Sequence, residues 1–405
     1  MVAVRAQVWV TLVVVVVLAA AVAQWFRPVP APTVALARTT MAVPGPRPHL
    51  PIPAGVPTYV DVPAVGALAG QDATTPRPIG SVAKMMTALL VLKAHPLGLY
   101  AQGPTLTVTA AEAATEVADA ANQQSVMPVT AGEKLSERKA LEGLLIASAN
   151  NIADMLGVWI AGSDAKFVAQ MNAEAKTLGL TGTHYADASG LAPQTVSTPQ
   201  DQVRLAEDAM RIPLFAAIVA MPQMTLPNGG GLSYNYNYAL GKNGIVGVKT
   251  GSTTQGGASF VWAAANGGTG TATVYGALLG QMATTPTASQ LGVILSEGQS
   301  LARSALAAVG SHTVLARGAS AGTLDVAWSP PVRLVTTAPV TIEGWGGLAV
   351  HMRLVAKAPA AAKGIAAGTR VGVLVVTAGS QKVTVPLVTA SAVPAPSPSW
   401  RLRRL

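Results

Sequence analysis

Pro78-Ile-Gly-Ser-Val-Ala-Lys-Met-Met-Thr-Ala-Leu-Leu-Val-Leu92 combines a turn, a polar pair and an apolar run within a few residues. Ser81 and Lys84 are three residues apart, so a helix places both side chains on one face. The run from Met85 to Leu92 is apolar almost all round, which is typical of a helix buried in a large core. Gly80 allows a sharp turn just before it. The stretch therefore predicts a nucleophile at the start of a buried helix, with an amine one turn behind it.

The Ser-x-x-Lys pattern alone is a weak signal, because it occurs at Ser81/Lys84, Ser136/Lys139 and Ser163/Lys166. Ser136 begins a charged, solvated stretch and Ser163 follows an Ala-Gly pair, so both are interpreted as helix N-caps. Only Ser81 precedes a wholly apolar helix, where a lysine is costly to bury without a role. We therefore expect Ser81 and Lys84 to carry the chemistry.

Two further motifs follow in order, Ser148-Ala149-Asn150 and Lys249-Thr250-Gly251. Ser-x-x-Lys, Ser-Asp-Asn and Lys-Thr-Gly form the motif set of penicillin-binding proteins and class A β-lactamases. With its flanks, the chain resembles the low-molecular-mass penicillin-binding proteins from about Thr58 to about Ala390, and within them the D-alanyl-D-alanine carboxypeptidases. The flanking segments that carry this resemblance are Leu144–Asn151, Met171-Asn172, Leu178–His184 and Gly247–Gly251.

The resemblance implies an α+β fold, with an antiparallel sheet flanked by helices and a helical subdomain, of the β-lactamase/transpeptidase type. A small all-β domain follows. The periodicity of apolar residues agrees with this architecture. It predicts helices over 110–122, 136–147, 150–160, 164–178 and 285–309, and catalytic-domain strands over 59–62, 67–69, 245–251, 258–265 and 271–279. Further strands are expected over 313–315, 332–336, 340–343, 348–355, 370–377 and 383–388.

The chain divides into five expected segments. Residues 1–23 form a signal peptide or membrane anchor, because Val8–Ala23 has no charge and Ala21-Val22-Ala23 resembles a cleavage site. Residues 24–57 are rich in proline, which disfavours helix and sheet and favours either a stiff linker or a disordered propeptide. Residues 58–311 form the catalytic domain and 312–391 the small all-β domain. Residues 392–405 form a Pro-rich basic tail that either contacts anionic lipid or is a frayed terminus.

The composition excludes several classes of protein. Half of the residues are hydrophobic and 11% are charged, so the chain is not disordered. It has no cysteine, which excludes disulfides and thiolate metal sites. The net charge of +9 suits an anionic membrane surface or wall polymer, whereas no basic helix favours nucleic acid. The scattered histidines lack metal-ligand spacing, so we expect no metal and no cofactor.

The expected chemistry begins with Ser81, whose hydroxyl needs a base to become a nucleophile. Lys84 can serve if its pKa falls from about 10.4 to near 7. Burial and a second cation, Lys249, both act in that direction. Ser148 is the candidate proton relay to the leaving amine, and Asn150 the candidate ligand of the substrate amide.

The resemblance also implies the binding groups of the site. Lys249 and Thr250 would hold a substrate carboxylate, and Gly251 would let the strand approach the substrate backbone. The backbone N–H groups of Ser81 and Ser252 would form the oxyanion hole. The implied substrate is a peptidoglycan stem peptide that ends in D-Ala-D-Ala, and β-lactams, which mimic that terminus, would acylate Ser81. The family often has aspartate where this chain has Asn151.

Three alternatives are weighed against a carboxypeptidase. A class A β-lactamase needs a Glu-x-x-x-Asn motif between the second and third motifs, but Glu174 and Glu207 are followed four residues on by Leu178 and Arg211. A D,D-endopeptidase of peptidoglycan cross-links stays open, because the width of the cleft does not follow from sequence. A non-catalytic cell-wall-binding scaffold also stays open, although the intact motifs disfavour it.

Overall fold

The computed structural model describes residues 2–266, 273–282 and 289–404. The chain folds into two compact units. One is continuous, Pro48–Val309. The other is assembled from both ends of the chain, from the residues up to Arg47 and those from Gly310 onward. The continuous unit contains all three sequence motifs and is called the catalytic unit below; the other is called the β unit.

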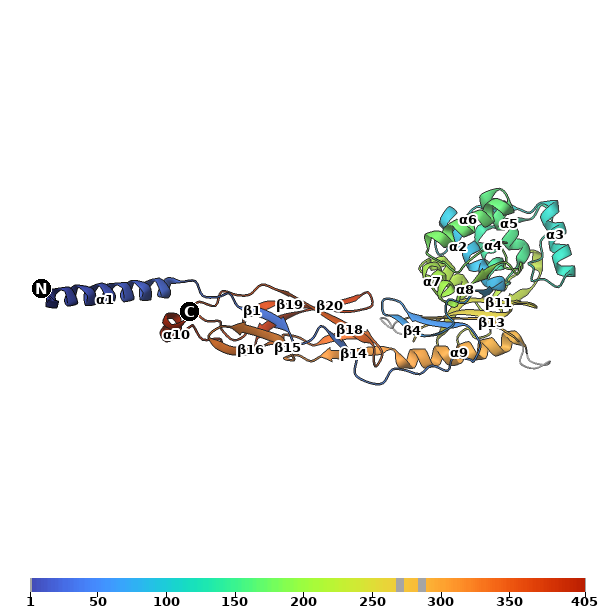
Figure 1. Cartoon of the computed structure of the whole chain (residues 1–405). Coiled ribbons are helices and arrows are strands. Elements are labelled where there is room, and N and C mark those ends of the chain that lie inside the picture. The colour runs from blue at the N-terminus through green and yellow to red at the C-terminus, as the bar shows by residue number, and fades with distance from the viewer. Residues whose placement is uncertain (1, 267–272, 283–288, 405) are drawn as a thin grey trace. The chain divides into compact units, whose positions relative to one another are not determined.

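The catalytic unit is built on a five-stranded antiparallel sheet with the strand order β11-β12-β13-β3-β4. Figure 1 labels β4, β11 and β13 of this sheet. The sheet combines strands from the beginning and the end of the unit, so the helical group is inserted between them, as the sequence predicts. The strands are β3 (Thr58–Val62), β4 (Gly66–Gln71), β11 (Ile245–Thr253), β12 (Gly257–Ala264) and β13 (Val274–Gln281). Residues 271–272 of the predicted strand 271–279 lie outside the described residues.

Helices cover both faces of this sheet, and β12 is consequently buried along its whole length. On one face, Phe260 and Trp262 lie against Gly298 of α9 (Gln290–Ala308), where a side chain on the glycine would overlap the Phe260 ring. On the other face, Val261 and Ala263 join the apolar core of the helical group. α7 (Pro199–Met210) packs on β13 and β3, and α8 (Pro213–Val219) packs on β11.

The helical group surrounds α2 (Lys84–Ala94), which contacts four other helices and is preceded by a 3-10 turn, η1 (Gly80–Ala83). Met85 and Met86 are fully buried, which confirms the predicted core helix. The other helices of the group are α3 (Ala110–Ala121), α4 (Glu137–Leu145), α5 (Asn150–Ala161) and α6 (Asp164–Thr177). Ser136 and Ser163 accept hydrogen bonds from backbone N–H groups at the starts of α4 and α6, which confirms both as N-caps.

Short elements complete the catalytic unit as two-stranded ladders between loops. They are β5 (Arg77–Pro78) with β8 (Val196–Ser197), β6 (Thr105–Thr107) with β7 (Lys134–Ser136), and β9 (Gln223–Thr225) with β10 (Leu232–Tyr234), besides the 3-10 turn η2 (Pro227–Gly229). The first of these ladders holds the segment that leads into η1. The nucleophile-bearing turn is therefore fixed on both sides, by β5 before it and α2 after it.

The β unit contains a seven-stranded sheet with the order β1-β15-β16-β20-β19-β18-β2 and a separate β14–β17 pair. The six strands predicted after residue 312 are all present, and β15 is an additional strand. The strands are β1 (Thr33–Leu36), β2 (Thr40–Ala42), β14 (Gly310–Leu315), β15 (Ser320–Val326), β16 (Ser329–Thr336), β17 (Val340–Gly344), β18 (Ala349–Ala356), β19 (Arg370–Ala378) and β20 (Gln381–Thr389).

The prediction that residues 24–57 form a linker without strands is wrong. β1 pairs with β15 and β2 pairs with β18, both antiparallel, and they occupy the two edges of the sheet. The prolines lie around Thr33–Leu36 and Thr40–Ala42 rather than within them, so every residue of both strands keeps its N–H. The catalytic unit correspondingly begins at Pro48 instead of residue 58.

The N-terminal apolar segment forms a helix, α1 (Val2–Phe26), of which Arg5–Phe26 is long and apolar enough to cross a membrane by length and composition. This agrees with a signal peptide or a membrane anchor, and it includes Trp25 and Phe26. At the other end, the tail predicted as 392–405 contains a helical turn, α10 (Pro398–Arg403), with Ser397 as its N-cap.

Candidate active site

Ser81 and Lys84 lie side by side at the start of α2. Lys84 Nζ is 2.8 Å from Ser81 Oγ. The same nitrogen donates to Asn150 Oδ1 at 2.7 Å and to the carbonyl oxygen of Ser189 at 3.0 Å. The structure thus brings the first two motifs into direct contact and adds a loop carbonyl from outside the motifs.

These contacts suit a neutral amine at Lys84. A neutral –NH₂ group has two N–H donors and one lone pair, and the two carbonyl oxygens of Asn150 and Ser189 accept both donors. The lone pair is then directed to Ser81, whose hydroxyl can donate to it. An ammonium group would place a third N–H there instead. The arrangement can therefore remove a proton from Ser81 only when Lys84 is neutral.

The environment of Lys84 lowers its pKa. Burial is the largest cause and lowers the pKa from 10.5 to about 7, while the negative charges of Asp187 and Asp154 oppose it. The side chain has no exposed surface, and a buried ammonium loses its hydration. The difference corresponds to about 5 kcal/mol in favour of the neutral form. Neutral and protonated forms of Lys84 consequently coexist near pH 7.

The second and third motifs meet through Ser148 and Lys249. Lys249 Nζ is 2.9 Å from Ser148 Oγ and 3.0 Å from the carbonyl oxygen of Thr250. Ser148 has a φ of 58°, in the left-handed region, at the junction between α4 and α5. This strained backbone turns its side chain toward β11. Burial, followed by the positive charge of Lys84, holds the pKa of Lys249 well below its usual value.

Glycine is required at position 251 for a different reason from the expected one. A Cβ at this position would lie 2.4 Å from the carbonyl oxygen of Ile79 and 3.0 Å from the amide nitrogen of Ser81. Glycine therefore lets β11 press against the turn that carries the nucleophile, rather than only against a substrate. Gly190 plays the same part from the other side, because a Cβ there would overlap the carbonyl oxygen of Gly80.

Two neighbouring asparagines at the start of α5 have separate tasks. Asn150 accepts from Lys84 and donates through Nδ2 to Gln124 Oε1 at 2.7 Å. Asn151 accepts from the Met127 N–H at 3.0 Å and donates to the Met127 carbonyl oxygen at 2.9 Å. Asparagine can do both where aspartate could only accept. Asn151 therefore fixes the segment that carries Gln124.

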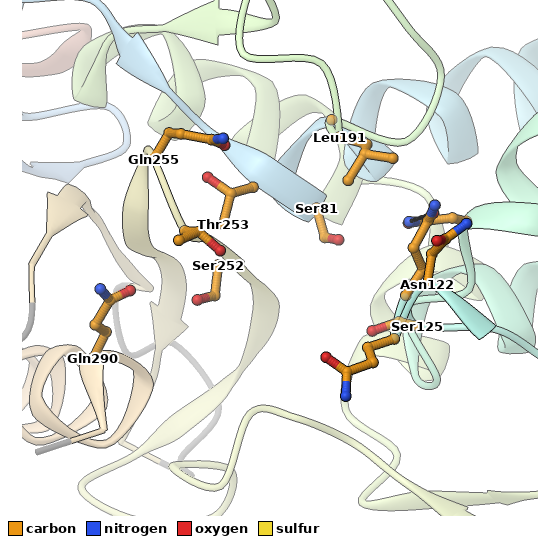
Figure 2. A pocket seen from close by; sticks show the side chains of 13 residues that line it. Ser81, Asn122, Ser125, Leu191, Ser252, Thr253, Gln255 and Gln290 are labelled. Carbon is orange, nitrogen blue, oxygen red and sulfur yellow. Dashed lines mark hydrogen bonds between the residues drawn. The ribbon is translucent and has the colours of Figure 1, made fainter. Parts of the chain in front are cut away.

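Ser81 opens into two cavities. The smaller, about 140 Å³, is lined by Ser148, Thr250, Gly251, Ser252, Tyr236 and three other residues including Ser81. The larger, about 470 Å³, lies between the segment 122–125 and the turn 252–255. Figure 2 shows Ser81 between these two walls, with Asn122 and Ser125 on one side and Ser252 and Thr253 on the other. Lys249 lines neither cavity and lies behind Ser148, 2% exposed.

The structure thus gathers the seven other candidate residues around Ser81, and it adds three residues that the sequence did not indicate. Ser189 acts through its backbone carbonyl, which no motif reveals. Asp187 shapes that loop by accepting hydrogen bonds from Ser189 Oγ, from Thr195 Oγ1 and from the backbone N–H of Leu191. Gln124 follows α3 in a loop without motif character.

The fold and the site together define the penicillin-binding class of serine acyl-transfer enzymes. An antiparallel sheet lies between helices, and a serine–lysine pair begins a buried helix. The strand that carries Lys-Thr-Gly lines the smaller cavity through Thr250 and Gly251. The chain belongs to the D-alanyl-D-alanine carboxypeptidase family of serine peptidases, whose family model matches residues 48–277, more than half of the chain. The resemblance inferred from the motifs is confirmed.

Individual relatives agree with this assignment. The chain is 36% identical over 228 residues to a D-alanyl-D-alanine carboxypeptidase of Mycobacterium tuberculosis, covering 54% of this chain and 74% of the relative. It is 28% identical over 226 residues to a D-alanyl-D-alanine endopeptidase of Escherichia coli, covering 52% and 68%. Penicillin-binding protein 5 of Haemophilus influenzae superposes with a TM-score of 0.60 at 20% identity, covering 85% of this chain and 99% of that one, and shares the fold.

Proposed function

We propose that this chain releases the terminal D-alanine from peptidoglycan stem peptides ending in D-Ala-D-Ala, through an acyl-enzyme on Ser81. The observation that carries the proposal is the arrangement of Lys84, which lies 2.8 Å from Ser81 Oγ while two carbonyl oxygens accept its other hydrogen bonds. β-Lactams, which resemble the same terminus, are the expected inhibitors.

Acylation begins when Lys84 takes the Ser81 proton and Oγ attacks the carbonyl carbon of the penultimate D-alanine. The negative oxygen that forms is stabilised by the backbone N–H groups of Ser81 and Ser252. The C–N bond then breaks, and the leaving amine takes a proton through Ser148. Water attacks the ester in the second half of the reaction, and Ser81 recovers its proton as the shortened peptide leaves.

The small cavity suits the departing D-alanine and its carboxylate. The Thr250 and Ser148 hydroxyls line it and can donate to carboxylate oxygens, while Lys249 supplies positive charge from behind Ser148. A carboxylate nearby raises the pKa of a lysine, so substrate binding favours the protonated form of Lys249. A charge-assisted hydrogen bond contributes about 1.5–3 kcal/mol, or some 10- to 150-fold in specificity for a free terminus.

The deciding experiment compares a pentapeptide with a free C-terminus and the same peptide amidated there. A carboxypeptidase releases D-alanine from the free form and largely ignores the amide, and Lys249→Gln narrows that preference. An endopeptidase cuts cross-linked dimers instead, and a non-catalytic scaffold cuts none of these substrates. Equal turnover of the free and amidated peptides would show that Lys249 does not bind a substrate carboxylate, and it would contradict the carboxypeptidase assignment.

A fluorescent penicillin tests the nucleophile independently. Wild-type protein is expected to form one covalent adduct, which mass spectrometry places on Ser81, and Ser81→Ala should form none. Ser136→Ala is the matched control, because Ser136 has the same Ser-x-x-Lys spacing but caps α4. An adduct that survives in Ser81→Ala would overturn the assignment.

We also propose that α1 directs the catalytic unit to the cell envelope, either as a cleaved signal peptide or as an anchor at the outer face of the cytoplasmic membrane. The apolar span Arg5–Phe26 supports both forms. Fractionation of cells, with N-terminal sequencing of the mature chain, separates them: an anchor keeps the helix, and a signal peptide leaves a chain beginning near Gln24. Protein found only in the cytoplasm would contradict both.

A further inference from the structure

The walls of the larger cavity are entirely neutral. Apart from Ser81 and Asn150, they consist of carboxamides, hydroxyls, one glycine and one leucine, and no lysine, arginine, aspartate or glutamate is among the described lining residues. The carboxamides belong to Asn122, Gln123, Gln124, Gln255 and Gln290.

Lys84, the basic group that contacts two of the wall residues, is buried and lies among carboxyl groups. Asp187 and Asp154 are close enough to Lys84 to act on its pKa, and Asp119 and Asp164 act on the pKa of Asp154. The two lysines of the site are buried, and neither lines the cavity. A carboxylate entering the cavity would give up water and find no charged side chain in the wall to compensate for that loss. A neutral carboxamide would meet both donors and acceptors.

One wall residue is oriented by the catalytic centre itself. Gln124 Oε1 accepts the hydrogen bond from Asn150 Nδ2, and Asn150 Oδ1 accepts from Lys84. This sequence of bonds fixes which end of the Gln124 carboxamide faces Asn150, and it leaves the Gln124 –NH₂ group as a donor beside the cavity. A ligand carbonyl oxygen can accept from it, whereas a ligand ammonium group cannot.

We propose that this cavity is a subsite for the acyl-donor side of the stem peptide and selects a side chain that ends in a neutral carboxamide over one that ends in a carboxylate. The proposal rests on the proposed function, because it assigns the cavity next to Ser81 to the residue preceding D-Ala-D-Ala. It names the substrate class more narrowly: stem peptides whose side-chain carboxyl groups are amidated.

The test uses two nearly isosteric probes, N-acetyl-L-glutaminyl-D-alanyl-D-alanine and N-acetyl-L-glutamyl-D-alanyl-D-alanine. They differ only in carrying an amide or a carboxylate at the side chain that faces the cavity. The release of D-alanine is expected to show a kcat/KM about tenfold or more higher for the glutamine peptide, the effect of one lost hydrogen bond and one uncompensated charge. Equal values, or a preference for the glutamate peptide, would overturn the proposal.

A charge-reversal variant makes the test specific to the cavity. Gln255→Lys adds a cation to the wall and is expected to shift the ratio of the two kcat/KM values by about tenfold toward the glutamate peptide. Thr177→Lys, at the exposed end of α6, adds the same charge outside the cavity and is expected to leave the ratio unchanged. A ratio that does not respond to Gln255→Lys, or that responds equally to both variants, would count against the subsite.

Binding separates this proposal from the proposed function. In Ser81→Ala, the affinities of the two peptides measured by calorimetry should differ in the same direction as the kcat/KM values. If wild-type protein releases no D-alanine but Ser81→Ala still prefers the glutamine peptide, the proposed function fails and the subsite stands. If D-alanine is released from both peptides equally and both bind equally, the subsite fails and the proposed function stands.

Discussion

Replacing Asn150 with aspartate should move the pH dependence of acylation upward without removing activity. Asn150 Oδ1 lies 2.7 Å from Lys84 Nζ, and aspartate keeps that oxygen while adding a negative charge. An opposite charge at this range raises the pKa of a lysine by about 1–3. The pKa of Lys84, about 7 in the wild-type site, would therefore rise to about 8–10.

The size of the effect follows from the fraction of neutral amine. Lys84 is the base only above its pKa, so activity is lost as pH falls through that value. At pH 7 the neutral fraction falls from about one half to between roughly one in ten and one in a thousand, so acylation slows about 5- to 500-fold. At pH 10 at least about half of the Lys84 amine is neutral in both proteins, and the rates should agree within about twofold.

The assay is the rate of acylation by a fluorescent penicillin between pH 5.5 and 10. Asn151→Asp is the matched control, because it introduces the same charge one residue on, where the side chain contacts Met127 and not Lys84. Its midpoint should shift less than that of Asn150→Asp, because the new charge does not contact Lys84. If Asn150→Asp is slower by the same factor at every pH, Asn150 serves substrate binding alone and Lys84 is not the base.

Two further predictions concern the supports of the site. In Gly251→Ala, the new Cβ would lie 2.4 Å from the carbonyl oxygen of Ile79, so we expect the free energy of unfolding in urea to fall by about 1–3 kcal/mol and penicillin acylation to slow at every pH. In the control Gly98→Ala, the new Cβ enters open space and should change neither quantity. A Gly251→Ala protein with wild-type activity and stability would refute the close contact. Asn151→Ala and Asn172→Ala each remove a carboxamide that bonds both the N–H and the carbonyl group of a distant residue, so each should lower the free energy of unfolding in urea by about 2–3 kcal/mol. Only Asn151→Ala, which releases Met127, should also slow acylation by penicillin. Equal acylation rates for the two variants would show that the segment before Met127 needs no support from Asn151.

Much of the fold follows from sequence because the catalytic unit has strong local patterns. The helices at 110–122 and 164–178 have apolar residues at helical spacing, and their observed ends differ by a residue. The strands at 33–36 and 40–42 lack such a signal. They are short and surrounded by prolines, and their partners are about three hundred residues away, so no local pattern identifies them.

The candidate site divides in the same way. Ser81, Lys84 and Lys249 were identified because their chemistry depends on side chains in ordered motifs. The part played by Ser189 was not, because a backbone carbonyl is the same for every residue type, and only the loop geometry places it 3.0 Å from Lys84. The contact of Gly251 with the nucleophile-bearing turn was not predicted either, because the Lys-Thr-Gly motif does not indicate which backbone segment packs against its glycine.

The two edge strands make the catalytic unit an insertion within the β unit. Thr33 pairs with Asp325, so the ladder closes only after the whole catalytic unit has been synthesised. Until then, β1 and β2 have no partner strands and remain unpaired. When the catalytic unit unfolds, it becomes a long flexible loop between β1 and β2 and their partner strands. Each doubling of the length of such a loop adds about 0.6 kcal/mol to the free-energy cost of closing it. An inhibitor bound covalently at Ser81 should therefore also raise the melting temperature of the β-unit sheet, through the connectivity of the chain.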